Sequence, residues 1–175
     1  FIITGVFFAF GLVIGVARLF FGEEEENPER QNMSAPKERV YDFADVLTDA
    51  EEEKLREYIA RKEPLIQADI VLVTIKEDVE SGAYGWETAM MNYADDFYDE
   101  RTAEDSDGIL VLIDMDNREI YISTCGKAIR YLTDARIERI LDAGFYYVSN
   151  GDYASCLSVM LSTAEYYYDA GIQEN

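Results

Sequence analysis

The stretch "EDSDGILVLIDMDNREIYIST" (Glu104–Thr124) decides the fold class of this chain. Its first apolar run, "GILVLID", has no polar position until its last residue, which is typical of a strand buried on both faces of a sheet. Its second run, "REIYIST", alternates between polar and apolar residues, as expected for a strand with one exposed face. Only "MDNR" separates the two runs. We therefore expect a tight turn and an antiparallel pair of strands.

Two earlier stretches also have the pattern of strands. The run "ADIVLVTI" (Ala68–Ile75) is continuous and β-branched, which again indicates a strand covered on both faces. The shorter run "RVYDF" (Arg39–Phe43) is predicted as the first strand.

Helical patterns lie between and after these strands. The first runs from Thr48, which heads a capping box, to Pro64, which is expected to close the helix. The second is "YGWETAMMNYADDFYDE" (Tyr84–Glu100), and two more cover residues 133–150 and 151–171. Helices between buried strands imply right-handed crossovers. The sequence therefore predicts an α/β fold, a three-layer α/β/α sandwich with a small mixed, mainly parallel sheet.

The composition restricts the function classes. The 175 residues include 36 Asp and Glu but 15 Lys and Arg, a net charge of -21, so nucleic-acid binding is not expected and cations or basic partners are favoured. Acidity that only keeps the domain soluble is the alternative. With no histidine, Ser-His-Asp catalysis and imidazole zinc sites are excluded. Cys125 and Cys156 are either a disulfide or, as we favour, two unpaired thiols.

The N-terminal segment "FIITGVFFAFGLVIGVARLFFG" (residues 1–22) is apolar except for Thr4 and Arg18. Its length suits a transmembrane helix, and we favour an uncleaved anchor over a signal peptide or a core helix. Residues 23–39 are charged and hold two of the three prolines, which indicates an acidic linker. Because positively charged loops stay in the cytoplasm, these acids favour a single-pass cell-membrane protein with an extracytoplasmic domain. Residues 40–171 form that domain and residues 172–175 a tail.

A group of carboxylates surrounds the start of the third strand. Asp96 and Asp99 lie near the end of the second helix, and Asp105 and Asp107 precede the strand that follows it. Because a helix that runs antiparallel to its next strand ends beside the start of that strand, these acids are expected to converge. Like charges this close repel one another, and a calcium ion would offset the repulsion. The sequence therefore predicts a Ca2+ site, with a solvated acidic loop as the alternative.

Two other acidic pairs receive a structural interpretation. Asp114 and Asp116 form an Asp-x-Asp after an apolar strand, as in haloacid-dehalogenase phosphatases, but Asn117 and a new strand follow at once. A hairpin turn is therefore the favoured interpretation. Asp42 and Asp45 follow the first strand, and turn roles account for them.

An anion site is a further hypothesis. Gly126 follows the fourth strand, where a positive φ or a close backbone approach is expected, and Lys127 and Arg130 come next. An anion held by these bases and by the helix that begins near Thr133 would lie beside the carboxylates. A metal next to an anion pocket would allow phosphatase chemistry without histidine. A turn glycine with two surface bases is the simpler interpretation.

The order of these segments resembles the TPM domain family. The resemblance rests on "VYDFADVLTDAEEEKL", "ADIVLVTI", "YADDFYDE", "SDGILVLIDMDNREIYISTCGKAI", "LTDARIERIL" and "GDYASCLSVML". It extends over roughly residues 40–171. It implies an α/β/α sandwich, and members of the family have been credited with calcium binding, with acid phosphatase activity and with assisting membrane-protein assembly.

The resemblance and the residues together lead to two functional hypotheses. We favour a membrane-anchored domain that binds calcium and acts through contacts with a membrane or surface protein, in assembly or quality control. The aromatic stretches "GFYYV" and "EYYYD" are candidates for that contact surface. The alternative is an enzyme, a metal-dependent acid phosphatase, for which the sequence assigns no catalytic residue.

Overall fold

The computed structural model describes residues 38–76, 79, 85–102 and 106–173. In chain order the described elements are β1 (Val40–Asp42), α2 (Asp49–Ile66), β2 (Asp69–Ile75), α3 (Trp86–Asp99), β3 (Gly108–Asp114), β4 (Glu119–Cys125), α4 (Ala128–Tyr131), α5 (Asp134–Ser149) and α6 (Tyr153–Asp169).

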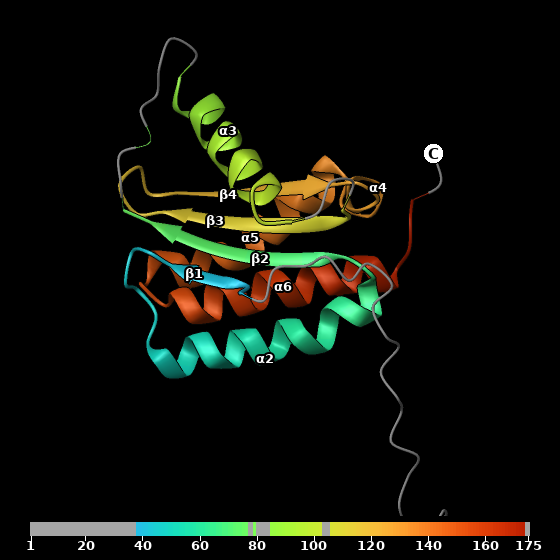
Figure 1. Ribbon diagram of the computed structural model, residues 1–175, viewed down its shortest axis with the longest axis horizontal. Helices are drawn as coiled ribbons and strands as arrows, with labels where there is room; N and C mark the ends of the chain where they lie inside the picture. Colours follow the sequence, from blue (N-terminus) through green and yellow to red (C-terminus); the bar gives the residue numbers. More distant parts are fainter. Residues whose placement is uncertain (1–37, 77–78, 80–84, 103–105, 174–175) are drawn as a thin grey trace, which may run out of the picture.

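The strands form one mixed sheet in the order β1-β2-β3-β4. β1, β2 and β3 are parallel, and β4 pairs antiparallel with β3. Figure 1 shows α3 over one face of the sheet and α2, α5 and α6 over the other. The predicted α/β sandwich with a mainly parallel sheet is therefore confirmed.

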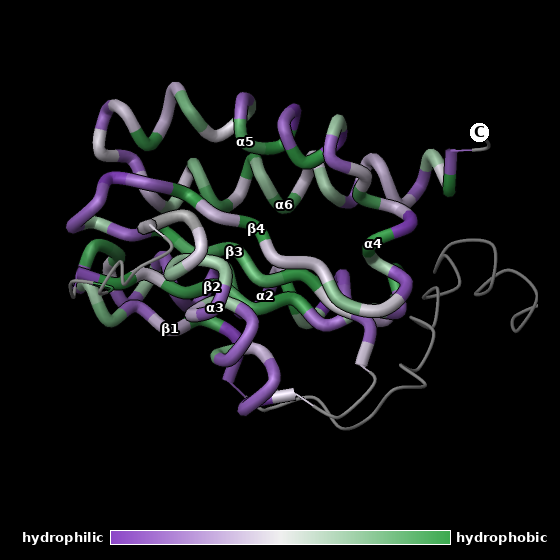
Figure 2. Tube along the Cα trace, turned by 90° about the horizontal axis from the view of Figure 1, so that it is seen from above, coloured by the Kyte–Doolittle hydropathy of each residue, from purple (hydrophilic) through white to green (hydrophobic). Residues whose placement is uncertain are grey.

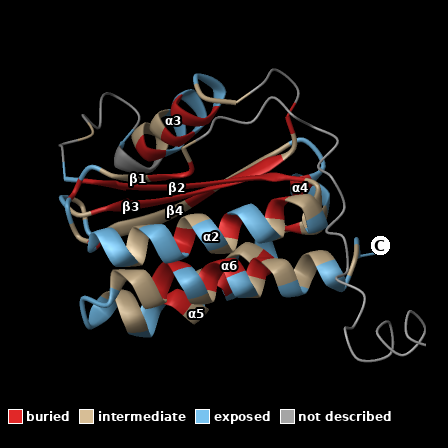
Figure 3. Cartoon of the chain, turned by 60° about the horizontal axis from the view of Figure 1, so that its bottom comes forward, coloured by how far each residue is buried: buried red, intermediate tan, exposed pale blue. Residues whose placement is uncertain are grey.

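The two central strands are buried because helices cover both of their faces. Every residue of β2 and of β3 is buried, as Figure 3 shows, and Figure 2 shows both strands as hydrophobic. Successive side chains of a strand point to opposite faces. Ile70 and Leu72 accordingly belong to the core beneath α2, α5 and α6, whereas Val71 and Val73 pack with Met90 of α3.

Helix α2 begins at the predicted residue. Its last residue, Ile66, lies two positions beyond the predicted end at Pro64. Thr48 is its N-cap and forms the reciprocal capping box with Glu51. The prediction that Pro64 closes the helix is wrong, because Pro64 lies inside its last turn. A proline has a helical φ and therefore does not stop the residues after it from continuing the helix. The helix ends at Ile66, and its C-cap, Gln67, is left-handed (φ 55°) and donates its backbone N–H to the Glu63 carbonyl.

The predicted transmembrane anchor, residues 1–22, lies outside the described residues, and so does nearly all of the predicted linker, residues 23–39. None of the helices in the described part of the chain has the length and apolar character that crossing a bilayer requires.

Candidate functional site

The amino ends of β2 and β3 meet the carboxyl end of β4 at the corner where the sequence places its acidic site. Asp107 precedes β3, and its carboxylate is held by one residue, Lys127. One oxygen accepts the backbone N–H of Lys127 at 2.6 Å, and the other lies 3.3 Å from its ammonium nitrogen. Gly126 permits this approach, because a Cβ there would collide with the Asp107 carboxylate and because its φ is +61°. The prediction of a positive φ and a close approach at Gly126 is confirmed.

Asp99 lies at the same corner, near Cys125 at the end of β4. Burial raises the pKa of the Cys125 thiol, and the negative charges of Asp99, Asp107 and Asp95 raise that pKa further. Asp95 also accepts a hydrogen bond from the Ser123 hydroxyl at 2.6 Å. Asp95 and Asp99 therefore lie on the side of α3 that faces β4.

Asp96 lies on a different side of the same helix. It lines a pocket with Phe43, Ile75 and Phe97 at the carboxyl ends of β1 and β2. Around the axis of α3, Asp96 is turned by about 100° from Asp95, which faces β4, and by about 60° from Asp99. Of the predicted calcium set, Asp99 and Asp107 thus both lie near Cys125, whereas Asp96 lines the pocket beside Phe97.

The described residues do not fit a calcium site at this corner. No group of three or more acidic or cysteine side chains is placed to hold a metal ion within the described part of the chain. The Asp107 carboxylate already has Lys127 as its partner. Asp105 lies outside the described residues, so calcium binding there stays a prediction.

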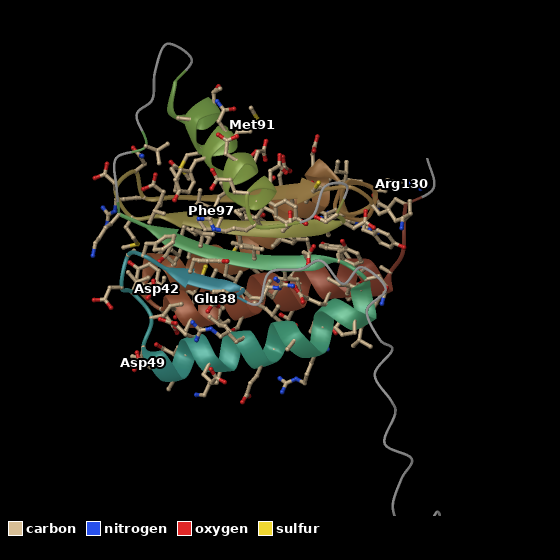
Figure 4. The ribbon with its side chains drawn as sticks, in the orientation of Figure 1. Glu38, Asp42, Asp49, Met91, Phe97 and Arg130 are labelled. Atoms are coloured by element: carbon tan, nitrogen blue, oxygen red, sulfur yellow. The ribbon has the colours of Figure 1, made fainter. Side chains whose placement is uncertain are left out.

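The two predicted anion-binding residues lie on and before the short helix α4. Lys127 is the N-cap of α4 and is engaged by Asp107, so its charge is already compensated. Arg130 is exposed. Figure 4 places it at the opposite end of the sheet from Asp42. Thr133 is the N-cap of α5, as predicted, but its side chain makes no capping hydrogen bond.

The acids at the carboxyl edge of the sheet have structural roles. Asp114 is fully buried and accepts the backbone N–H groups of Asp116 (2.9 Å) and Asn117 (3.1 Å), and the side-chain amide of Asn117. Asp42 accepts the N–H groups of Val46 and Leu47 and the Thr74 hydroxyl. Both predicted turn roles are confirmed, because these oxygens hold the loops that follow β1 and β3.

A pocket of about 510 Å³ lies at this same edge, between the β3–β4 hairpin and helices α5 and α6. We call it the carboxyl-edge pocket. Its apolar lining consists of Ile113, Met115, Ile120, Leu141, Phe145, Val148 and Tyr153. Arg118, Glu119 and Asp142 also line it. Ligands of open α/β sheets commonly bind outside the carboxyl ends of the strands, and this pocket has that position.

Exposed aromatic residues adjoin the carboxyl-edge pocket. Phe145 lines it and is 69% exposed, and the next residue, Tyr146, is 70% exposed. The stretch "GFYYV" was a sequence candidate for a contact surface, and its exposure agrees with that interpretation. The sequence did not point to Arg118, whose φ of +60° places it at the hairpin turn. The Asp-Asn-Arg turn signal was the available clue.

Comparisons with known proteins agree with the fold. The sequence profile of the TPM domain matches residues 40–166. The chain is 32% identical over 145 residues to the UPF0603 protein YdjH of Bacillus subtilis (strain 168); the match covers 83% of this chain and 53% of YdjH, so the chain spans about half the length of that relative.

Two solved structures share the fold. The N-terminal domain of a protein from P. gingivalis, solved by solution NMR, has a TM-score of 0.57 at 21% identity, with 79% of this chain and 85% of that chain covered. The N-terminal domain of the cg2496 protein from Corynebacterium glutamicum, also solved by NMR, has a TM-score of 0.53 at 14% identity, with 86% and 89% covered. At these identities the likeness concerns the fold alone.

Proposed function

This chain belongs to the TPM domain family, and we propose that its domain is a membrane-anchored, extracytoplasmic binding module that acts through direct contacts with another protein. The carboxyl-edge pocket is the observation that carries the proposal. It combines an apolar lining with the exposed ring of Phe145, and an apolar pocket with aromatic anchors is the usual centre of a protein contact. The apolar residues 1–22 support the membrane anchor.

The occupant that fits this pocket is an apolar side chain of a partner segment with basic residues beside it. The apolar lining takes the side chain, because removing it from water is favourable. The lining also holds three acids, Asp114, Glu119 and Asp142, and one base, Arg118. The whole chain has a net charge of -21, which attracts basic segments over several ångströms at physiological salt.

We expect Phe145→Ser to weaken binding of a short peptide that carries leucine and phenylalanine between lysines. The loss should be about tenfold, because the variant removes one exposed aromatic anchor. Fluorescence anisotropy with a labelled peptide measures it on the full chain in detergent. Tyr166→Ser is the matched control, since Tyr166 is 65% exposed and lies outside the pocket. Equal losses in the two variants, or no binding by the wild type, would contradict the proposal.

A metal-dependent acid phosphatase at the Asp107 corner is the second candidate, and what supports it is the group of acids Asp99, Asp105 and Asp107 in the sequence. Under our first proposal, p-nitrophenyl phosphate is not hydrolysed with or without calcium. Calcium-dependent turnover that is lost in Asp107→Asn would favour the phosphatase instead. A calcium-dependent rise in Tm without turnover would support calcium binding alone.

A further inference from the structure

A second pocket, the aromatic pocket, lies at the carboxyl ends of β1 and β2 beside α3. Its volume is about 560 Å³, and it is lined by Phe43, Ile75, Tyr93, Asp96, Phe97, Glu100 and Arg101. It is on the α3 side of the sheet, whereas the carboxyl-edge pocket is on the side of α5 and α6. The two pockets therefore present separate contact sites.

Aromatic rings gather around Phe97 in this pocket. The ring centroids of Tyr41, Phe43 and Tyr93 lie 5.0, 6.0 and 6.0 Å from that of Phe97. Phe97 itself is buried beneath α3, as Figure 4 shows, but Phe43 is 51% exposed. An exposed large aromatic ring beside a cavity leaves apolar surface that a partner can cover.

Arg101 covers the face of Phe97 in this pocket. Its guanidinium carbon lies 3.6 Å from the centroid of Phe97 and 5.5 Å from that of Tyr41, so a planar cation stacks on the ring face. The same group donates to the Phe97 carbonyl at 3.2 Å and pairs with Glu100 at 3.0 Å. Arg101 remains partly exposed, with a side-chain exposure of 30%, and is held by the last turn of its own helix.

The charges around the rings suit a cation. Asp96 and Glu100 line the pocket and outnumber Arg101, so its net charge is negative even with Arg101 in place. Asp96 is exposed, and among the described residues Arg101 pairs with Glu100 rather than with Asp96. A cation that enters the pocket can therefore contact the Asp96 carboxylate and the faces of the aromatic rings. Its interaction energy with both is larger where water is excluded.

We propose that the aromatic pocket binds an arginine side chain of a basic partner segment, which takes the place of Arg101 on the face of Phe97. In the absence of the partner, Arg101 occupies the face of the Phe97 ring that the partner arginine would cover. The incoming guanidinium stacks on Phe97, and Asp96 neutralises its charge. This site is distinct from the carboxyl-edge pocket and does not depend on the function proposed for it.

The test uses an arginine-containing peptide, acetyl-Gly-Arg-Gly-amide, and its citrulline analogue, titrated into the full chain and followed by NMR shifts of α3. Citrulline has nearly the shape of arginine without the charge, so it should bind at least about fivefold more weakly. Arg101→Ala should strengthen arginine binding about fivefold, because it vacates the ring face. Asp96→Asn should weaken it about fivefold.

Asp95→Asn is the matched control. It removes the same charge from the same helix, about 100° around the axis from Asp96, where Asp95 accepts a hydrogen bond from the Ser123 hydroxyl of β4, and it should change affinity less than about twofold. Equal effects of Asp96→Asn and Asp95→Asn, equal binding of citrulline and arginine, or weaker binding by Arg101→Ala would each overturn the proposal. Phe145→Ser should leave peptide binding unchanged, so failure of this inference is distinguishable from failure of the proposed function.

Discussion

Replacing Glu63 by alanine is expected to lower the free energy of unfolding by about 3–5 kcal/mol. Glu63 is only 7% exposed and pairs with Arg39, which is 8% exposed and also contacts the fully buried Asp69 at 3.3 Å. The same carboxylate accepts the backbone N–H of Ile70 at 2.9 Å. Removing it takes a partner from a buried guanidinium and an acceptor from a buried amide. Both losses are costly, because water does not replace them.

Urea unfolding monitored by circular dichroism measures this loss. The matched control is Glu52→Ala, since Glu52 pairs with Arg56 at 2.6 Å on the partly exposed face of α2. An ion pair of that kind contributes less than about 1 kcal/mol, so the control should lose little stability. A loss from Glu63→Ala no larger than that of Glu52→Ala would show that the buried pair does not hold β1, α2 and β2 together.

The second large effect is expected at Gly108, the first residue of β3. Gly108→Ala should cost at least about 3 kcal/mol, because the new Cβ would collide with the Tyr98 hydroxyl and lie 2.6 Å from its ring carbon Cζ. Neither group moves easily. Tyr98 is 3% exposed and its hydroxyl is 2.9 Å from that of Ser106, while Gly108 is paired with Asp69 on β2 and Cys125 on β4.

Thermal unfolding of a double-mutant cycle tests the cause. Tyr98→Leu removes the phenol ring, so it should abolish most of the stability loss caused by Gly108→Ala. The expected coupling energy is about 2 kcal/mol or more. Gly144→Ala is the control, because its Cβ would meet the buried side chains of Met160 (2.8 Å) and Cys156 (3.0 Å) and not Tyr98, so its loss should add to that of Tyr98→Leu without coupling. Additive losses at Gly108 and Tyr98 would mean that the collision is not what makes glycine necessary.

The described acids at the ends of the strands have different surroundings at the two edges of the sheet. At the amino edge, Asp107 is bound to Lys127 and, with Asp99, surrounds Cys125. At the carboxyl edge, the carboxylates of Asp42 and Asp114 accept backbone hydrogen bonds from the loops that follow them. The pockets open at the carboxyl edge, which the sequence analysis did not select. Clusters of acidic residues in the sequence thus did not predict where the pockets lie, because the position of a pocket depends on how neighbouring helices and strands pack.

Local sequence determined the four strands, the longer helices and the family of this domain, but not the short helix α4 or the end of α2. The apolar run of β3, the Asp116–Asn117 turn and the capping box at Thr48 depend on residues within a few positions of one another, so their pattern can be read directly. The parallel sheet followed from helices placed between buried strands.

Tertiary structure alone decided which groups meet. Asp95 and Asp96 are adjacent, yet Asp95 accepts a hydrogen bond from Ser123 of β4 and Asp96 lines the pocket beside Phe97, because the position of α3 over the sheet decides what each side of the helix meets. Arg39 is hydrogen-bonded to Glu63, which is 24 residues away in the sequence. Phe145 lines a pocket with residues of the β3–β4 hairpin, which are also distant from it in the sequence. Contacts of that kind depend on the path of the chain through space, and no periodicity in the sequence records them.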